Sequence, residues 1–161
     1  LKDHGGTVLQ GGSGDVAGRA VDVTVVDSPD LDSPLMTEEI FGPVLPIVTT
    51  PSLDAAIEHI NTRPKPLAAY VFSESATTRR TFRDRVPAGA VVGNAVAVHV
   101  LAPELPFGGV GNSGMGAYHG EWGFQTFSHR KANLDRPTRP DPRFVYPPYG
   151  PLTRKLLRKV F

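Results

Sequence analysis

The sequence predicts an α/β fold with a largely parallel sheet. Strand-like and helical apolar patterns alternate between residues 21 and 92, in the order strand, helix, strand, helix, strand. This order is typical of crossover connections between parallel strands. Glycine and proline are also abundant, with 17 and 16 residues, which predicts fixed turns and long shaped loops between the elements.

The first 26 residues predict short strands. Residues 1–4 are expected to be a last helical turn ended by Gly5 and Gly6. Because chains rarely start at the end of a helix, we expect more protein to precede Leu1. Thr7 to Gln10 reads as a strand, and Gly11 to Gly18 as a turn region. A second strand is predicted where three valines alternate with other residues, at positions 21, 23 and 25.

Two helices are expected in the middle of the chain. Ser52 can cap the first, and Pro64 ends it. Its apolar residues fall on one face, at positions 53, 56, 57 and 60. The segments that follow predict a strand over 67–72, a helix over 75–86 and a strand over 88–92.

The last third of the chain divides into three kinds of segment. Residues 103–123 form a glycine-rich loop, and Trp122 to His129 return to strand character. The prolines of residues 136–151 predict an extended segment. Leu152, Leu156, Leu157 and Val160 then fall on one face of a short basic helix.

Composition excludes several classes of protein. Cysteine is absent, so this chain has no disulfide, no thiolate metal site and no cysteine nucleophile. The chain has no apolar run of the roughly 18 residues that a membrane span needs. Charge is uneven: residues 1–129 carry 8 basic and 14 acidic side chains, whereas residues 130–161 carry 9 basic and 2 acidic ones. We therefore expect a basic tail on a mildly acidic domain.

Two glycine patterns and the histidines are weak signals. Residues 12–17 and 109–114 match the dinucleotide-binding spacing, but neither is followed by the helix start that would face a pyrophosphate. Both are interpreted as loop glycines. The five histidines lack the helical spacing of a metal site, so no metal ligand is predicted.

The segment Glu38-Glu39-Ile40-Phe41-Gly42-Pro43 carries more chemistry. A carboxylate can accept hydrogen bonds from two neighbouring hydroxyls, as on a ribose. An aromatic ring two residues further on could pack on a flat ring. From these residues alone, a solvated acid pair beside a core phenylalanine is the favoured reading.

This segment and a second one carry a family resemblance. The second runs Leu105-Pro106-Phe107-Gly108-Gly109-Val110-Gly111-Asn112-Ser113-Gly114-Met115-Gly116. Together they resemble the C-terminal third of an aldehyde dehydrogenase. Tyr118-His119-Gly120 and Thr126-Phe127-Ser128-His129 are similar to the class 3 branch of fatty, aromatic and coniferyl aldehyde enzymes. The likeness covers about residues 1–149.

The resemblance implies oxidation of aldehydes to carboxylic acids with NAD or NADP. Glu39 would bind the nicotinamide ribose hydroxyls, and Phe41 would lie beside the nicotinamide ring. Asn94, His99 and Phe107 would belong to the substrate pocket. Asn94 would begin the loop that lines the substrate tunnel, although the alternating valines at 96, 98 and 100 alone would predict a strand there.

The resemblance also divides the chain and implies partners. It places the catalytic-domain part at 1–121, an oligomerisation strand at 122–135 and an extended Pro-rich tail with a short basic helix at 136–161. The nucleophile and most of the cofactor site would lie upstream, so we expect a fragment that is inactive alone. The full enzyme is expected to be a cytoplasmic homodimer.

Three readings compete for the chain as a whole. The first is an enzyme fragment, and the second is a non-catalytic assembly module derived from the same family. The third is a nucleic-acid binder that uses the basic tail, which the prolines between its aromatic residues disfavour. For the terminal helix, docking on the same enzyme or its dimer mate is favoured over contact with an anionic membrane.

Overall fold

The computed structural model describes residues 5–160, so the helical turn expected at residues 1–4 lies outside the described residues. The chain forms two compact units, Leu1–Phe127 and Ser128–Phe161. This division falls inside the segment 122–135. No helix within residues 5–160 is long and apolar enough to cross a bilayer.

The first sheet of unit 1 is mixed. It has the order β1 (Thr7–Gln10), β4 (Thr24–Asp27) and β5 (Val44–Ile47). β4 runs antiparallel to β1 and parallel to β5, with Thr24 opposite Val44. Gly11, at a φ of 72°, lies so close to β4 that a Cβ would be 2.4 Å from the carbonyl oxygen of Val23. The glycine is therefore required by close backbone approach.

The strand predicted around Val21 to Val25 is two strands. β3 (Ala20–Val21) pairs antiparallel with β2 (Gly14–Asp15), and β2 lies in the segment predicted as a turn region. β4 belongs to the first sheet. The Thr24 hydroxyl donates to the Asp22 carbonyl at 2.9 Å. This local bond accompanies the bend of the chain between β3 and β4.

The middle of unit 1 matches the predicted crossover pattern. It comprises α2 (Leu53–Asn61), β6 (Ala68–Val71), α3 (Ala76–Arg85) and β7 (Ala90–Gly93), and β6 pairs parallel with β7. Ser52 caps α2 as expected, since its hydroxyl accepts from the Ala55 N–H at 3.1 Å. Ser75 caps α3 in the same way through the Thr78 N–H.

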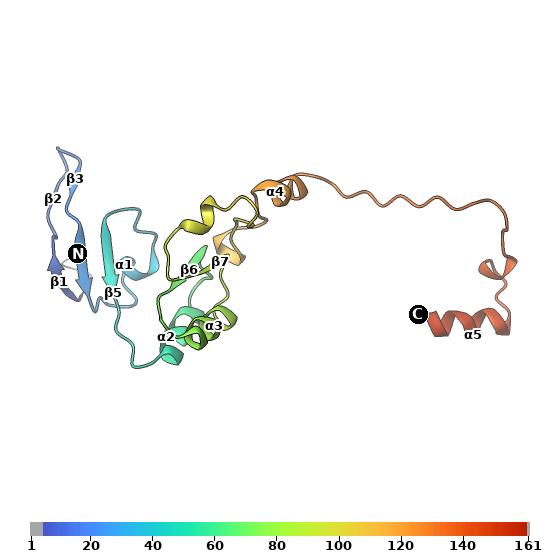
Figure 1. Cartoon of the computed structure of the whole chain (residues 1–161), viewed down its shortest axis with the longest axis horizontal. Coiled ribbons are helices and arrows are strands. Elements are labelled where there is room, and N and C mark those ends of the chain that lie inside the picture. The colour runs from blue at the N-terminus through green and yellow to red at the C-terminus, as the bar shows by residue number, and fades with distance from the viewer. Residues whose placement is uncertain (1–4, 161) are drawn as a thin grey trace. The chain divides into compact units, whose positions relative to one another are not determined.

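The core of unit 1 lies between these two helices and β6. Figure 1 shows α2 and α3 side by side, next to β6 and β7, and the helices pack against each other. The buried residues Ile57, Ala69, Val71, Phe82 and Val86 form one apolar cluster. They come from α2, β6, α3 and the residue that caps α3, which explains why the crossover is well specified by apolar patterning.

The structure adds detail to two expectations about the elements. First, the parallel pairs β4–β5 and β6–β7 are accompanied by the antiparallel pairs β1–β4 and β2–β3. Second, the loop that the resemblance predicts to begin at Asn94 contains a short 3₁₀ turn, η1 (Val98–Leu101), which follows Ala97 at a φ of 60°, in place of the strand that the alternating valines alone would predict. A left-handed residue at that position interrupts an extended run.

One expectation about the elements was wrong: the strand predicted over Trp122–His129 is replaced by a helix, α4 (Gly120–Thr126). Helical backbone bonds run from the N–H of Gly123 to His119 and from Phe127 to Gly123, each 3.1 Å. The Trp122 indole also donates to the Glu104 carbonyl at 3.1 Å. Tertiary contacts thus override the strand preference of the aromatic residues.

Unit 2 has less regular structure. Residues 129–137 are extended without a pairing strand among the residues described, followed by η3 (Arg143–Val145) and α5 (Pro151–Val160). Arg136 and Asp141 form an ion pair at 2.9 Å, and the Tyr146 hydroxyl donates to the same carboxylate. α5 confirms the predicted terminal helix.

Candidate functional site

The loop that carries Glu39 and Phe41 is anchored at both ends. At its start, the N–H of Glu38 donates to the Pro34 carbonyl and ends the short helix α1 (Pro34–Thr37). At its end, the Pro43 carbonyl accepts from the N–H of Thr24 at 2.8 Å, at the first residue of β4. The sheet and α1 therefore position the loop between residues 38 and 43.

Phe41 has an unusual backbone conformation for a bulky residue. Its φ is 44° and its side chain is 91% exposed. A bulky side chain at positive φ is a conformational outlier, and such strain is concentrated at functional sites. Solvent exposure adds a second cost, because the ring gains no burial in this chain. The backbone therefore keeps the Phe41 ring exposed to solvent.

Glu39 lies two residues before this ring, and its side chain is exposed. An ionised carboxylate offers two acceptor oxygens and no donor. The loop therefore presents hydrogen-bond acceptors for hydroxyl groups close to a flat apolar surface. A ribose attached to an aromatic base matches this pairing of groups.

Asn94 is bound to the backbone. Its Oδ1 accepts from the N–H of Ser73 at 2.8 Å, and its Nδ2 donates to the Ser73 carbonyl at 3.1 Å. Ser73 follows β6 and Asn94 follows β7, so the amide joins the carboxyl ends of two parallel strands. Both functions of the side chain are used, and Asn94 shapes the start of the next loop.

His99 and Phe107 are brought together by the structure. Their ring centroids lie 5.8 Å apart, and His99 also contacts Tyr70 edge-on at 6.1 Å. His99 is 9% exposed, and neither of its ring nitrogens has a hydrogen-bond partner within the described residues. A buried imidazole without a partner is costly, which marks this cluster as a candidate pocket wall.

Phe107 lies between two histidines. His119 stacks on it at a centroid distance of 5.8 Å, and Tyr118 meets it edge-on at 5.4 Å. The backbones of Phe107 and Tyr118 exchange two hydrogen bonds of 2.9 Å. This isolated bridge closes the glycine-rich loop and fixes the Phe107 ring.

The glycines of this loop are needed for packing. A Cβ on Gly109 would lie 2.0 Å from the Ser113 carbonyl oxygen, and one on Gly108 would lie 2.1 Å from that of Gly116. The backbone folds back on itself too closely for any larger residue. This agrees with the interpretation of residues 109–114 as loop glycines.

The predicted residues thus fall into two groups. Glu39 and Phe41 lie on the loop after α1, whereas Asn94, His99 and Phe107 lie beyond β7. Tyr70 and Ser73 were missed as partners of His99 and Asn94, because their contacts depend on tertiary structure. The contacts of Phe107 with Tyr118 and His119 join two segments of the class 3-like motif, and that motif is the sequence feature that points to them.

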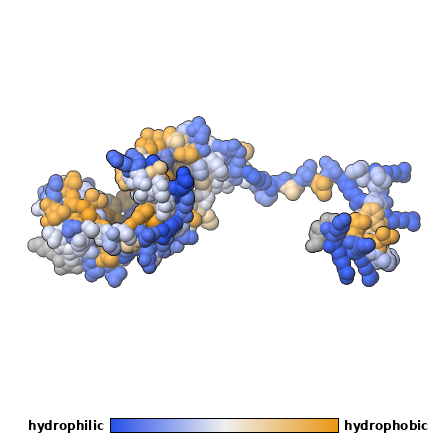
Figure 2. Space-filling view, turned by 60° about the horizontal axis from the view of Figure 1, so that its bottom comes forward, coloured by the Kyte–Doolittle hydropathy of each residue, from blue (hydrophilic) through white to orange (hydrophobic). Residues whose placement is uncertain are grey.

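The surface of unit 1 carries many apolar side chains (orange in Figure 2). Met115, Phe127 and Phe41 are 99%, 88% and 91% exposed. Monomeric proteins rarely expose large contiguous apolar patches, and such surfaces mark contact with other protein. Unit 1 therefore leaves several large apolar side chains without cover among the described residues.

The described elements of unit 1 form an α/β crossover fold that presents an exposed acidic and aromatic loop. A family model described as "Aldehyde dehydrogenase family" matches residues 1–133. The chain therefore belongs to the aldehyde dehydrogenase family.

Individual relatives agree with this assignment. The mouse protein named "Aldehyde dehydrogenase, dimeric NADP-preferring" is 50% identical over 143 residues, which are 88% of this chain and 32% of that protein. "Aldehyde dehydrogenase family 3 member H1" of Arabidopsis thaliana is 44% identical over 98% of this chain and 32% of its own length. The chain spans about a third of the length of these relatives.

A solved structure matches the fold over nearly the whole chain. The substrate-bound state of Staphylococcus aureus AldH superposes with a TM-score of 0.83 at 42% identity, covering 96% of this chain and 33% of that one. The α/β fold and its class 3 character are therefore confirmed.

Proposed function

We propose that this chain is the C-terminal part of an NAD(P)-dependent enzyme that oxidises aldehydes to carboxylic acids. The observation that carries the proposal is the loop at residues 38–43, which holds an exposed Phe41 at a strained φ beside an exposed carboxylate. The family match supports the reaction class. Because the chain has no cysteine, the nucleophile comes from the part of the enzyme outside it, and the chain alone is inactive.

In this proposal, Glu39 accepts hydrogen bonds from the nicotinamide ribose, and Phe41 lies against the nicotinamide ring. The bound cofactor would accept hydride from the substrate. Fixing the ribose matters because hydride transfer requires the donor and acceptor carbons in close, aligned contact. An exposed carboxylate and an exposed ring on one anchored loop suit that task.

His99 and Phe107 form one wall of the aldehyde pocket. Ring packing around them supports this role, since buried aromatic side chains provide an apolar surface of defined shape. Asn94 contributes by fixing the loop that leads to His99. Its amide is engaged with Ser73, so its contribution is to shape the pocket.

The proposal includes NAD and NADP as alternative cofactors. Relatives include enzymes named NADP-preferring. The groups that select the cofactor surround its adenosine ribose, and Glu39 is proposed to act at the other ribose. Either cofactor therefore fits the residues of this chain.

We also propose a cytoplasmic homodimer. The name of the mouse relative includes the word dimeric, and residues 129–137 are extended without a paired strand among the described residues. Such a segment can add to a sheet edge of a second subunit. The alternative function, a non-catalytic assembly module, would keep this contact and lose turnover.

The proposal is tested by Glu39→Gln in the full-length enzyme. The variant keeps one acceptor oxygen and loses the charge, which weakens charge-assisted hydrogen bonds by at most about 1.5–3 kcal/mol. We expect a roughly ten- to hundredfold loss of kcat/KM and slower hydride transfer in single-turnover kinetics. Kinetics equal to those of the parent would remove Glu39 from the site.

Glu38→Gln is the matched control. It removes a neighbouring exposed carboxylate on the same loop, and it leaves the backbone N–H that caps α1. We expect kinetics close to those of the parent. An inactive parent enzyme with both cofactors would instead favour the assembly module.

A further inference from the structure

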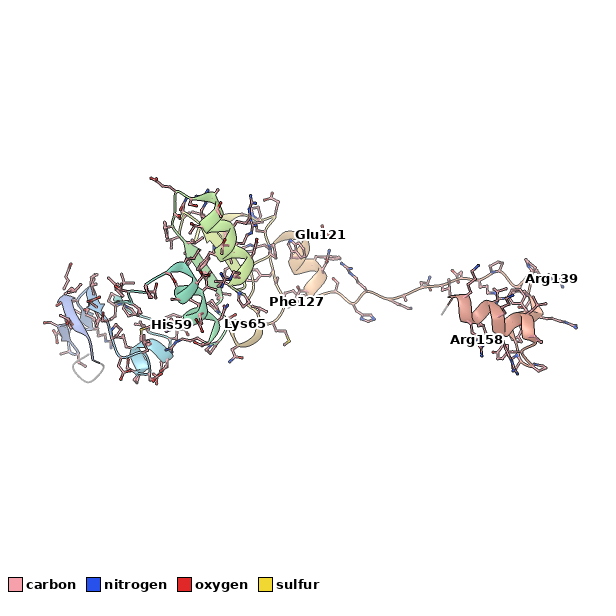
Figure 3. The ribbon with its side chains drawn as sticks, turned by 90° about the horizontal axis from the view of Figure 1, so that it is seen from below. His59, Lys65, Glu121, Phe127, Arg139 and Arg158 are labelled. Carbon is pink, nitrogen blue, oxygen red and sulfur yellow. The ribbon has the colours of Figure 1, made fainter. Side chains whose placement is uncertain are left out.

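We propose that Arg63 is a positioning residue that holds α1 and thereby sets the loop of Glu39 and Phe41. This inference rests on the proposed function for its catalytic consequence. Arg63 follows α2, far from the loop in sequence. Figure 3 labels His59 on α2 and Lys65 in the turn after it, and Arg63 lies between these residues in the sequence.

Two hydrogen bonds join Arg63 to the segment around α1. Its Nη2 donates to the carbonyl oxygen of Leu31 at 2.6 Å, and its Nη1 donates to that of Met36 at 3.4 Å. Leu31 precedes α1, and Met36 lies within it. One planar guanidinium therefore contacts both the segment before α1 and α1 itself, with a fixed two-donor geometry that a lysine ammonium reproduces only in part.

α1 needs such an external contact. It has only four residues, and the side chain of its N-cap, Ser33, accepts no hydrogen bond from the helix. Helices this short are unstable in isolation. Glu38, which ends α1, is also the first residue of the loop at residues 38–43. Unfolding of α1 would therefore release the start of that loop.

The base of Arg63 is rigid. Its backbone N–H donates to the Ile60 carbonyl at 3.1 Å, at the end of α2. Two prolines close by, Pro64 and Pro66, restrict the chain after it. α2 in turn is packed into the buried core through Ile57. Arg63 therefore connects the buried core of unit 1 to the segment that leads into the loop of Glu39 and Phe41.

The first test is hydrogen exchange on the full-length enzyme. Met36, Thr37 and Glu38 donate backbone hydrogen bonds to Ser33 or Pro34, so their amides report whether α1 is formed. In Arg63→Ala we expect their exchange to accelerate at least about tenfold, as expected for loss of one charge-assisted contact. Unchanged exchange would overturn the proposal, whatever the activity of the enzyme.

The matched control is Arg85→Ala. Arg85 pairs with Asp54 and joins α3 to α2 without contacting α1. We expect this variant to leave exchange in residues 36–38 unchanged. Faster exchange there in both variants would contradict a specific role for Arg63 and indicate general loosening.

The second test is a double-mutant cycle on the dissociation constant of NAD or NADP. If Arg63 acts by positioning Glu39, Arg63→Ala weakens cofactor binding by about tenfold in the parent and much less in Glu39→Ala. Arg63→Lys is expected to restore part of the loss. Additive effects would overturn the positioning role, whereas a parent that binds neither cofactor would contradict the proposed function alone.

Discussion

Asn94 makes two hydrogen bonds to the backbone of a single residue, Ser73, at 2.8 and 3.1 Å. These bonds join the ends of β6 and β7, where a parallel sheet delivers its loops to a binding site. Asn94 also has a φ of 57°, a conformation that asparagine tolerates better than most residues. The geometry gives the Asn94 side chain the role of fixing the backbone at the start of this loop.

This relationship predicts the behaviour of three variants. Asn94→Ala loses both hydrogen bonds and places alanine at positive φ, so we expect destabilisation of about 2–3 kcal/mol. Asn94→Gly tolerates the backbone and loses only the bonds, so its cost is smaller. Asn94→Asp keeps the acceptor and loses the donor.

Chemical denaturation of the full-length enzyme provides the measurement. Equal stability of Asn94→Ala and Asn94→Gly would argue that the positive φ costs nothing. Stability of both variants equal to that of the parent would contradict a structural role for the amide.

A separate prediction concerns the chain expressed alone. Its exposed apolar side chains include Met115 and Phe127, and β1, β5, β6 and β7 each have an edge without a partner strand among the described residues. Such surfaces associate in water. We expect aggregation or self-association in sedimentation velocity. A monodisperse monomer with a sharp two-state melt would contradict this.

The basic helix α5 carries the next prediction. Leu152, Leu156 and Leu157 are 80%, 55% and 42% exposed, and its charged residues are all basic. Four basic side chains contribute roughly 1 kcal/mol each near an anionic bilayer, which ordering of a short helix largely offsets. We therefore expect docking on the enzyme or its dimer mate.

Co-sedimentation of the full-length enzyme with anionic vesicles at physiological salt tests this preference. We expect little bound protein, and no change when residues 152–161 are deleted. Strong binding that disappears on this deletion would assign α5 to the membrane surface. Neutral vesicles serve as the control for nonspecific pelleting.

Much of the fold could be predicted because its signals are local. Ser52 caps α2, the apolar stripe of that helix packs into the core, and β6 is a continuous apolar run. β5 was not predicted because Pro46 lies within it and Pro43 precedes it, and proline disfavours a central strand. β5 lies at the edge of its sheet, where proline is tolerated. α4 was mistaken for a strand because its aromatic residues favour strands when tertiary contacts are unknown.

The candidate site divides in the same way. Glu39 and Phe41 were predicted as site residues because they lie two residues apart in a motif that resembles the aldehyde dehydrogenase family. The strain at Phe41 was not readable, since φ is set by how α1 and β4 anchor the loop. Arg63 was also missed, because its partners are 27 and 32 residues away.

A chimera tests the central claim most directly. This chain would replace the segment it matches in Staphylococcus aureus AldH, to which it is 42% identical. We expect the purified chimera to reduce NAD or NADP in the presence of an aldehyde, and to lose most of this activity on Glu39→Ala. A folded chimera that binds either cofactor no better than its Glu39→Ala variant, and forms no reduced cofactor, would contradict the account.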